Sequence, residues 1–96
     1  MSKHDDTANR IARQQGTEYN RGQGPDIIKS DKVIEVETAR SVDDASRQLA
    51  GFRKPAYVAG ADAEATAKAL EKYKNTTIGV MNQKGKIVRP STRKRK

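Results

Sequence analysis

Three carboxylates between residues 26 and 37 have the types and the spacing to carry chemistry. Asp26 directly follows Pro25, and Glu35 and Glu37 flank Val36 nine residues further on. Carboxylates that lie close together repel one another unless a cation or a proton comes between them. Glu is also depleted in strands, and a second Glu two residues away adds like-charge repulsion. The pattern therefore predicts an acidic site; the alternative is ordinary turn and surface chemistry.

Two short apolar runs, residues 24–28 and 33–38, must position these carboxylates. The four polar residues between the runs have the length and composition of a hairpin connection. Strand side chains alternate, so Glu35 and Glu37 share one face of the second run, while the apolar pair Ile34 and Val36, without Val33, points to the other. Pairing of the two runs would place Asp26 beside Glu35.

The residues Pro25-Asp26 and Glu35-Val36-Glu37 resemble the two motifs of the PD-(D/E)XK nuclease superfamily. In that family the Asp and the first acidic residue of the second motif hold a divalent metal ion, and the third motif position is usually Lys. The resemblance implies Mg²⁺ or Mn²⁺ on Asp26, Glu35 and the main-chain carbonyl of Val36. Glu37 departs from the pattern, although Glu-x-Glu versions occur in active restriction endonucleases; here it would position the attacking water or ligate a second metal.

A helix after the hairpin is predicted to begin at Ser41 as N-cap, with Asp44 in the capping-box position. Its apolar face consists of Val42, Ala45, Leu49 and Phe52. Gln48 and Phe52 resemble the Gln-x-x-x-Tyr motif of the RecB-like branch of the same superfamily, with Phe in place of Tyr. The resemblance implies that Gln48 orients the substrate or the water; the alternative is a surface amide beside a core Phe.

The remaining elements indicate an α/β fold. The periodicities and turn signals predict helices over residues 3–15 and 62–74, and strands over residues 17–24, 55–60, 76–81 and 86–88. Alternating strands and helices in the middle of the chain favour parallel pairing, joined here to an antiparallel meander. We therefore expect a small three-layer α/β sandwich with a mixed sheet. This order resembles the restriction-endonuclease-like core, including small Holliday-junction-resolvase-like domains, over roughly residues 5–88.

Charge and length suggest one domain with a basic end. The chain has 96 residues and a net charge of +8, and five of its basic residues occupy the last eight positions. We expect a single domain over residues 1–88 and a disordered basic tail over residues 89–96. Basic side chains bind nucleic-acid phosphates through the release of counterions. The expected contacts are Arg21, Lys84, Lys86, Arg89, Arg93, Lys94, Arg95 and Lys96, for which a solvated surface role is the alternative.

Several classes of function are disfavoured by composition. The chain lacks cysteine, which excludes disulfides and thiolate zinc sites. It shows neither the apolar core of a signal peptide nor a membrane-spanning run, so we expect a soluble, cytoplasmic protein without membrane contact. His4 is the only histidine and is expected to be solvated near the N-terminus, which leaves no Ser/His/Asp or Cys/His constellation.

Three functions follow from these observations. The first is a magnesium- or manganese-dependent DNA endonuclease with Asp26, Glu35, Glu37 and Gln48 in its active site. The second is a non-catalytic nucleic-acid-binding module on the same fold, and the third is a protein-interaction domain or part of a larger complex. Homodimerisation and the shape of the DNA (linear, branched or single-stranded) stay open.

Overall fold

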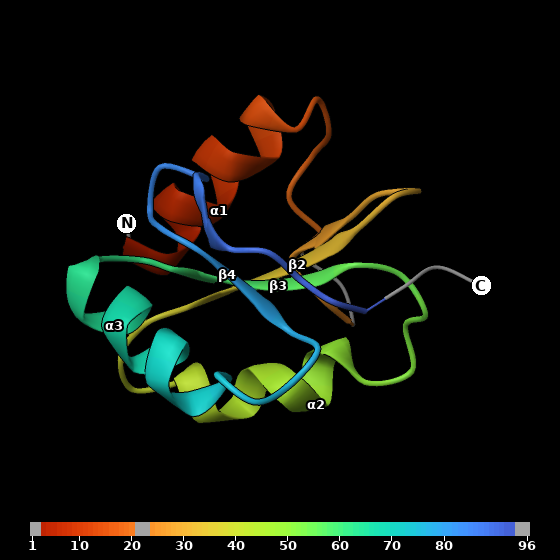
Figure 1. Ribbon diagram of the computed structural model, residues 1–96. Helices are drawn as coiled ribbons and strands as arrows, with labels where there is room; N and C mark the ends of the chain where they lie inside the picture. Colours follow the sequence, from red (N-terminus) through yellow and green to blue (C-terminus); the bar gives the residue numbers. More distant parts are fainter. Residues whose placement is uncertain (1–2, 21–23, 94–96) are drawn as a thin grey trace.

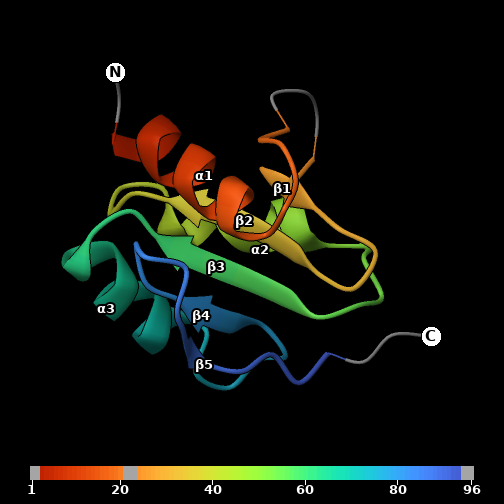
Figure 2. The same ribbon diagram turned by 90° about the horizontal axis from the view of Figure 1, so that it is seen from above.

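Five short strands form one mixed sheet in the computed structural model, which describes residues 3–20 and 24–93. The strands are β1 (Ile27–Ile28), β2 (Val33–Glu37), β3 (Ala56–Gly60), β4 (Gly79–Met81) and β5 (Ile87–Arg89), and they lie side by side in this order. The three central strands run parallel, whereas β1 and β5 pair antiparallel at the two edges. Figure 2 shows the sheet with β5 and β1 at its borders.

Helices cover both faces of this sheet (Figure 1). Helix α1 (Lys3–Gln14) lies on one face, and α2 (Ala45–Leu49) and α3 (Ala63–Lys72) lie on the other, with a 3₁₀ turn, η1 (Val42–Asp44), leading into α2. The predicted α/β sandwich with a mixed sheet is confirmed at this level. Among the described helices, none combines the length and the apolar character needed to cross a bilayer.

The alternation predicted for the second run of the hairpin is confirmed. Val33 belongs to the apolar cluster under α2 and α3, while Ile34 and Val36 belong to the cluster under α1. Helices cover the sheet on both faces, so β2 is buried along its whole length and supplies apolar side chains to both clusters. Glu35 and Glu37 therefore point toward the α2/α3 face, like Val33.

Two local predictions are wrong. The described residues of the expected strand at 17–24 form no strand; instead the side-chain amide of Asn20 donates to the Pro25 carbonyl at 3.0 Å. The helix expected from Ser41 begins as the 3₁₀ turn η1 and ends at Leu49, before Phe52. Neither Ser41 nor Asp44 makes the expected capping hydrogen bond; the Ser41 hydroxyl instead accepts from the Thr38 N–H at 3.1 Å. Gly51, with a φ of 87°, follows the end of this helix, a conformation that glycine adopts without strain.

The end of the chain is more ordered than predicted as far as residue 93. Arg89 belongs to β5, and the Ser91 hydroxyl donates to the Thr77 carbonyl at 2.7 Å. The Arg93 guanidinium donates to the carbonyls of Leu49 and Phe52, at 2.9 and 3.2 Å. Carbonyls at a helix C-terminus lack partners within the helix, and a cation is favoured there. The basic composition predicted disorder, and the ordering contacts could not be predicted because their partners are remote in sequence.

Replacing Arg93 should therefore destabilise the fold. We expect Arg93→Gln to lower the free energy of unfolding by about 1–2 kcal/mol, since carbonyls after α2 lose a charged donor. Arg53→Gln is the matched control, because Arg53 is exposed and its side chain makes no hydrogen bond or ion pair in the described part of the chain. Chemical denaturation of both variants measures the difference. Equal stability of the two would mean that Arg93 does not hold the chain end.

The core under α2 and α3 gives a second stability prediction. Leu49 is fully buried there, so Leu49→Ala should lower the free energy of unfolding by about 2–5 kcal/mol through lost burial and a cavity. Ile87→Ala, at a side chain 42% exposed on edge strand β5, should change it by less than about 1 kcal/mol. Thermal and urea unfolding compare the two. A small loss at Leu49 would contradict this packing.

Candidate metal-binding and catalytic site

The β1–β2 hairpin brings Asp26 and Glu35 together, as the sequence predicted. Ile27 pairs with Ile34, which sets the neighbouring residues opposite each other. The Asp26 N–H donates to Glu35 Oε1 at 3.1 Å, and the Val36 N–H donates to Asp26 Oδ2 at 2.9 Å. Each carboxylate is thus held by a main-chain N–H close to the other. The hairpin register, which is local, fixes their relative position.

Burial gives the two glutamates unusual proton affinities. Glu35 and Glu37 are only 8% and 4% exposed. Desolvation, with a hydrogen bond to Glu37 and the nearby charge of Asp26, raises the pKa of Glu35 to about 9. Desolvation also raises the pKa of Glu37. Because both charges cannot be buried side by side without compensation, the pair retains a proton at neutral pH.

One buried oxygen of this cluster is left unsatisfied by the residues that the structure describes. Glu37 Oε2 is buried and makes no hydrogen bond within the described residues. The side chains of Glu35 and Ser41 lower the pKa of Glu37, but desolvation outweighs them. A buried acceptor that lacks a donor is destabilising, so it marks a position where a cation, a water or a proton would be favoured.

His4 was expected to be solvated, and the structure shows otherwise. It lies in the first turn of α1, where its Nε2 is 3.1 Å from Asp26 Oδ2 and its Nδ1 is 3.4 Å from Asp5 Oδ1. The hydrogen bond to Asp26 raises the pKa of His4 to about 9, against the opposing effect of burial. A protonated imidazole therefore sits against the carboxylate at neutral pH. Only the packing of α1 onto the sheet reveals this, since no spacing in the sequence links residues 4 and 26.

The structure leaves Gln48 apart from this hydrogen-bonded group. Gln48 lies near the end of α2 and is half-buried. Within the described part of the chain, no hydrogen bond joins it to the carboxylates. Its proposed orienting role therefore stays a prediction, as does the role of the Val36 carbonyl as a ligand.

The predicted basic contacts separate into two groups. Lys84 and Lys86 are exposed on the turn between β4 and β5. Arg89 instead directs its guanidinium inward, donating to the Leu70 carbonyl at 2.9 Å and burying Nη2 without a partner among the described residues. Arg93 is engaged at the end of α2, as described above. The other predicted contacts lie outside the described residues: Arg21, Lys94, Arg95 and Lys96.

The described residues include no group of three or more His, Cys, Asp or Glu side chains arranged to hold a metal ion. A magnesium ion needs less than this, because it commonly keeps several waters and binds through one or two carboxylates together with substrate phosphates. Asp26 and Glu35 supply two such carboxylates. Their oxygens are hard donors of the type that Mg²⁺ and Mn²⁺ prefer.

Comparison with known proteins adds no relative. No family model matches the chain, and neither the curated proteins nor the solved structures contain a significant match.

Proposed function

We propose that this protein is a metal-dependent deoxyribonuclease of the PD-(D/E)XK type, with a restriction-endonuclease-like fold. The observation that carries the proposal is the hydrogen-bonded contact of Asp26 with Glu35 across the β1–β2 hairpin, with Glu37 continuing the acidic site along β2. Such a site would attract a cation, while the net charge of +8 favours a polyanionic partner. DNA is such a polyanion, and its phosphodiester is a group that a cation bound at the acidic site could polarise.

The residues present fit a hard divalent cation. Asp26 and Glu35 would hold it, with the Val36 carbonyl as a further oxygen ligand. The pKa of Glu35 is raised, and Glu37 Oε2 has no hydrogen-bond partner among the described residues; both features favour positive charge at this point. A cation of this kind, when bound, polarises a phosphate oxygen and lowers the pKa of a coordinated water.

Three side chains, those of Glu37, His4 and Gln48, would have further roles in the reaction. Glu37 would accept a proton from an attacking water through Oε2, which makes no hydrogen bond among the described residues, and desolvation raises the pKa of its carboxyl. His4, protonated at neutral pH, neutralises part of the acidic charge until a cation replaces it at Asp26. Gln48 would contact the substrate from α2.

A second candidate function is nucleic-acid binding without cleavage. It is favoured by the way main-chain N–H groups and His4 already bond the carboxylates of Asp26 and Glu35 without any ligand, as in a structural cluster. In that case Lys84 and Lys86 would carry most of the phosphate contacts. Binding that weakens steeply with salt, without cleavage in Mg²⁺ or Mn²⁺, would select this function.

A residue-resolved NMR titration with Mg²⁺, then with trace Mn²⁺, tests the proposal. We expect shifts and paramagnetic broadening confined to Asp26, Glu35, Val36 and Glu37. Asp31, exposed in the turn between β1 and β2, serves as the internal control for weak surface binding. The absence of a localised effect at millimolar metal would overturn the metal site and leave the binding module as the better account.

A further inference from the structure

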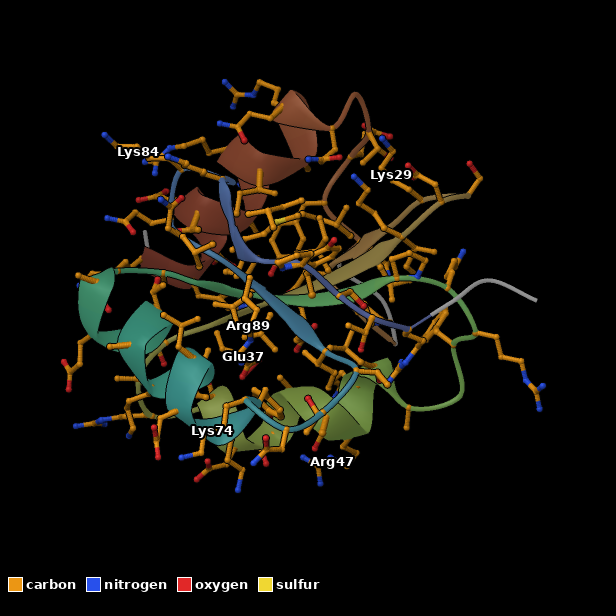
Figure 3. All side chains as sticks on the ribbon, in the orientation of Figure 1. Lys29, Glu37, Arg47, Lys74, Lys84 and Arg89 are labelled. Carbon is orange, nitrogen blue, oxygen red and sulfur yellow. The ribbon has the colours of Figure 1, made fainter. Side chains whose placement is uncertain are left out.

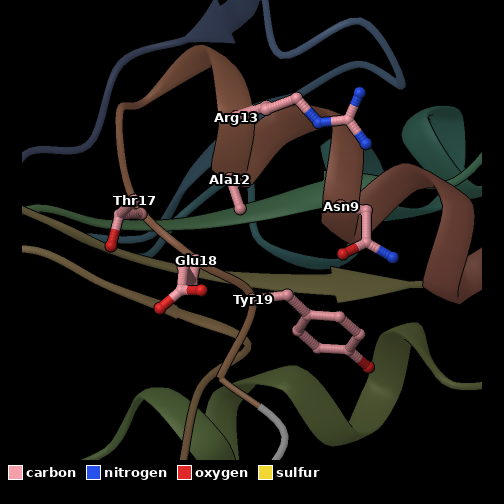
Figure 4. Close-up of a pocket in the computed structure, with 6 residues that line it drawn as sticks. All are labelled: Asn9, Ala12, Arg13, Thr17, Glu18 and Tyr19. Atoms are coloured by element: carbon pink, nitrogen blue, oxygen red, sulfur yellow. The ribbon is translucent and has the colours of Figure 1, made fainter.

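We propose that a pocket on the outer side of α1 holds the base of an unpaired nucleotide, so that the substrate is single-stranded or locally unpaired. This inference rests on the proposed function for its link to cleavage, but its binding step can be tested alone. The pocket has a volume of about 250 Å³ and lies between α1 and the segment that follows it (Figure 4). It is lined by Asn9, Ala12, Arg13, Thr17, Glu18 and Tyr19.

The lining residues match the parts of a nucleotide. Tyr19 offers an aromatic ring, on which any base can stack. Asn9 supplies an amide with both donors and an acceptor, and Glu18 supplies an acceptor for the amino group of a base. Arg13 supplies a guanidinium suited to phosphate. A site for a phosphate alone would not place a carboxylate in its wall.

The two charged residues of the pocket are available to a ligand. Arg13 and Glu18 are both exposed and line the same pocket, yet neither makes an ion pair within the described residues. Figure 4 shows Arg13 and Asn9 projecting from α1 on one side of the pocket, with Glu18 and Tyr19 on the opposite side. A base between them would meet ring, amide and carboxylate while its phosphate meets Arg13.

Tyr19 connects the pocket to the acidic site. Its hydroxyl donates to Asp5 Oδ1 at 3.1 Å and lies 3.4 Å from His4 Nδ1, and the His4 and Tyr19 rings are 6.0 Å apart. His4 in turn contacts Asp26 at 3.1 Å. One side chain thus separates the pocket wall from a predicted metal ligand. A nucleotide in the pocket would therefore lie near the phosphodiester to be cut.

A group of basic side chains continues from the pocket. Arg10 donates to the Gln83 carbonyl at 3.1 Å, which ties α1 to the turn that carries Lys84 and Lys86. Arg10, Arg13, Lys84 and Lys86 are exposed, and none has an acidic partner in the described ranges. Figure 3 shows Lys84 projecting to solvent beside α1.

The opposite side of the molecule differs. Arg47 on α2 lies 3.4 Å from Asp44, and Lys74, just after α3, lies 2.9 Å from Glu71, so these cations are already paired (Figure 3). Phosphates should therefore follow the α1 side, where Arg10, Arg13, Lys84 and Lys86 lie together without acidic partners among the described residues. The sequence alone does not single out Arg10 and Arg13, because on a helix of mixed charge they resemble ordinary surface residues.

Fluorescence anisotropy with a labelled mixed-sequence single strand, in EDTA to prevent cleavage, tests this pocket. We expect tighter binding to the single strand than to the matching duplex, because bases that are paired and stacked inside a duplex cannot enter the pocket. Arg13→Gln and Glu18→Gln should each weaken binding to the single strand several-fold, while the matched controls Arg53→Gln and Glu64→Gln should not. Tyr19→Leu should weaken it by roughly five-fold to 150-fold, the loss typical of one stacked base, and Tyr19→Phe should retain it.

NMR titration with dGMP, dTMP and inorganic phosphate shows whether the pocket recognises the base or only the phosphate. We expect dGMP to shift Asn9, Glu18 and Tyr19, with weaker shifts from dTMP, which lacks an amino group. Identical shifts from inorganic phosphate, or no shifts from dGMP at millimolar concentration, would overturn the proposal. So would unchanged binding in both Arg13→Gln and Glu18→Gln, which are surface changes that leave the core intact.

Different results would contradict the proposed nuclease function and the proposed nucleotide pocket. Asp26→Asn should retain binding to the single strand, whereas Glu18→Gln should retain the Mg²⁺ response of Asp26 and Glu35. Pocket binding by a wild-type protein that never cleaves would support the pocket and contradict the nuclease. Cleavage of duplex and single strand at equal rates, with unchanged rates in the pocket variants, would contradict the substrate class and support the nuclease.

Discussion

Asp26→Asn is expected to lower metal-dependent DNA cleavage by at least about a hundredfold, because groups that merely support metal ligands already contribute 10–100-fold. Asn keeps the size of Asp and an oxygen that can accept from the Val36 N–H, so the hairpin should stay intact. It removes the negative charge that would hold the cation. Cleavage of a labelled single strand in Mg²⁺, measured at several metal concentrations, quantifies the loss.

The matched control for this variant is Asp31→Asn. It makes the same change in charge within the same hairpin, at an exposed residue whose ion pair, with Lys32 at 3.9 Å, is weak. We expect wild-type cleavage from it. In Asp26→Asn the pKa of His4 should also fall toward its ordinary value, because the hydrogen bond to the carboxylate is its main cause. Full cleavage by Asp26→Asn with this fall in pKa would refute a catalytic role for the acidic site.

The second large effect is a loss of stability as pH rises. The pKa of Glu35 is raised from 4.5 to about 9 on folding, and that of His4 from 6.5 to about 9. The folded state therefore holds protons that the unfolded chain has released, and this stabilisation is complete only below the unfolded values. The free energy of unfolding should fall on the order of a few kcal/mol between about pH 5 and pH 9.

Urea denaturation across this pH range measures the fall, and Glu35→Gln is the informative variant. An amide cannot ionise, so the part of the decline that Glu35 causes should disappear. Glu64→Gln is the control, since Glu64 is exposed on α3. If Glu35→Gln declined as steeply as the wild type, burial of Glu35 would not govern its protonation.

Bound Mg²⁺ should counteract this fall in the free energy of unfolding at high pH. Metal ligands must lose their protons to bind, so the affinity for Mg²⁺ should rise with pH and binding should release protons. We expect saturating Mg²⁺ to stabilise the protein more at pH 8.5 than at pH 6, as measured by thermal unfolding. Equal stabilisation at both values would indicate that the cation binds elsewhere.

The sequence alone determined the hairpin and what it carries. Polar residues between two apolar runs set the turn, and the period of two along β2 placed Glu35 on the face opposite Ile34 and Val36. The helix predicted over residues 62–74 was equally readable, and in α3 the Asp62 side chain caps it by accepting from the Ala65 N–H at 2.8 Å. These features depend on residues within about ten positions of one another, where backbone geometry leaves few alternatives.

Tertiary structure alone decided the rest. The contact between His4 and Asp26 arises because α1 packs across the sheet, and Arg93 reaches the end of α2 from 44 residues away. The pocket beside Tyr19 likewise depends on how the chain returns after α1. A side chain's partner is fixed by which elements pack together, and that packing results from the burial of many apolar groups at once. No local pattern in the chain records its outcome.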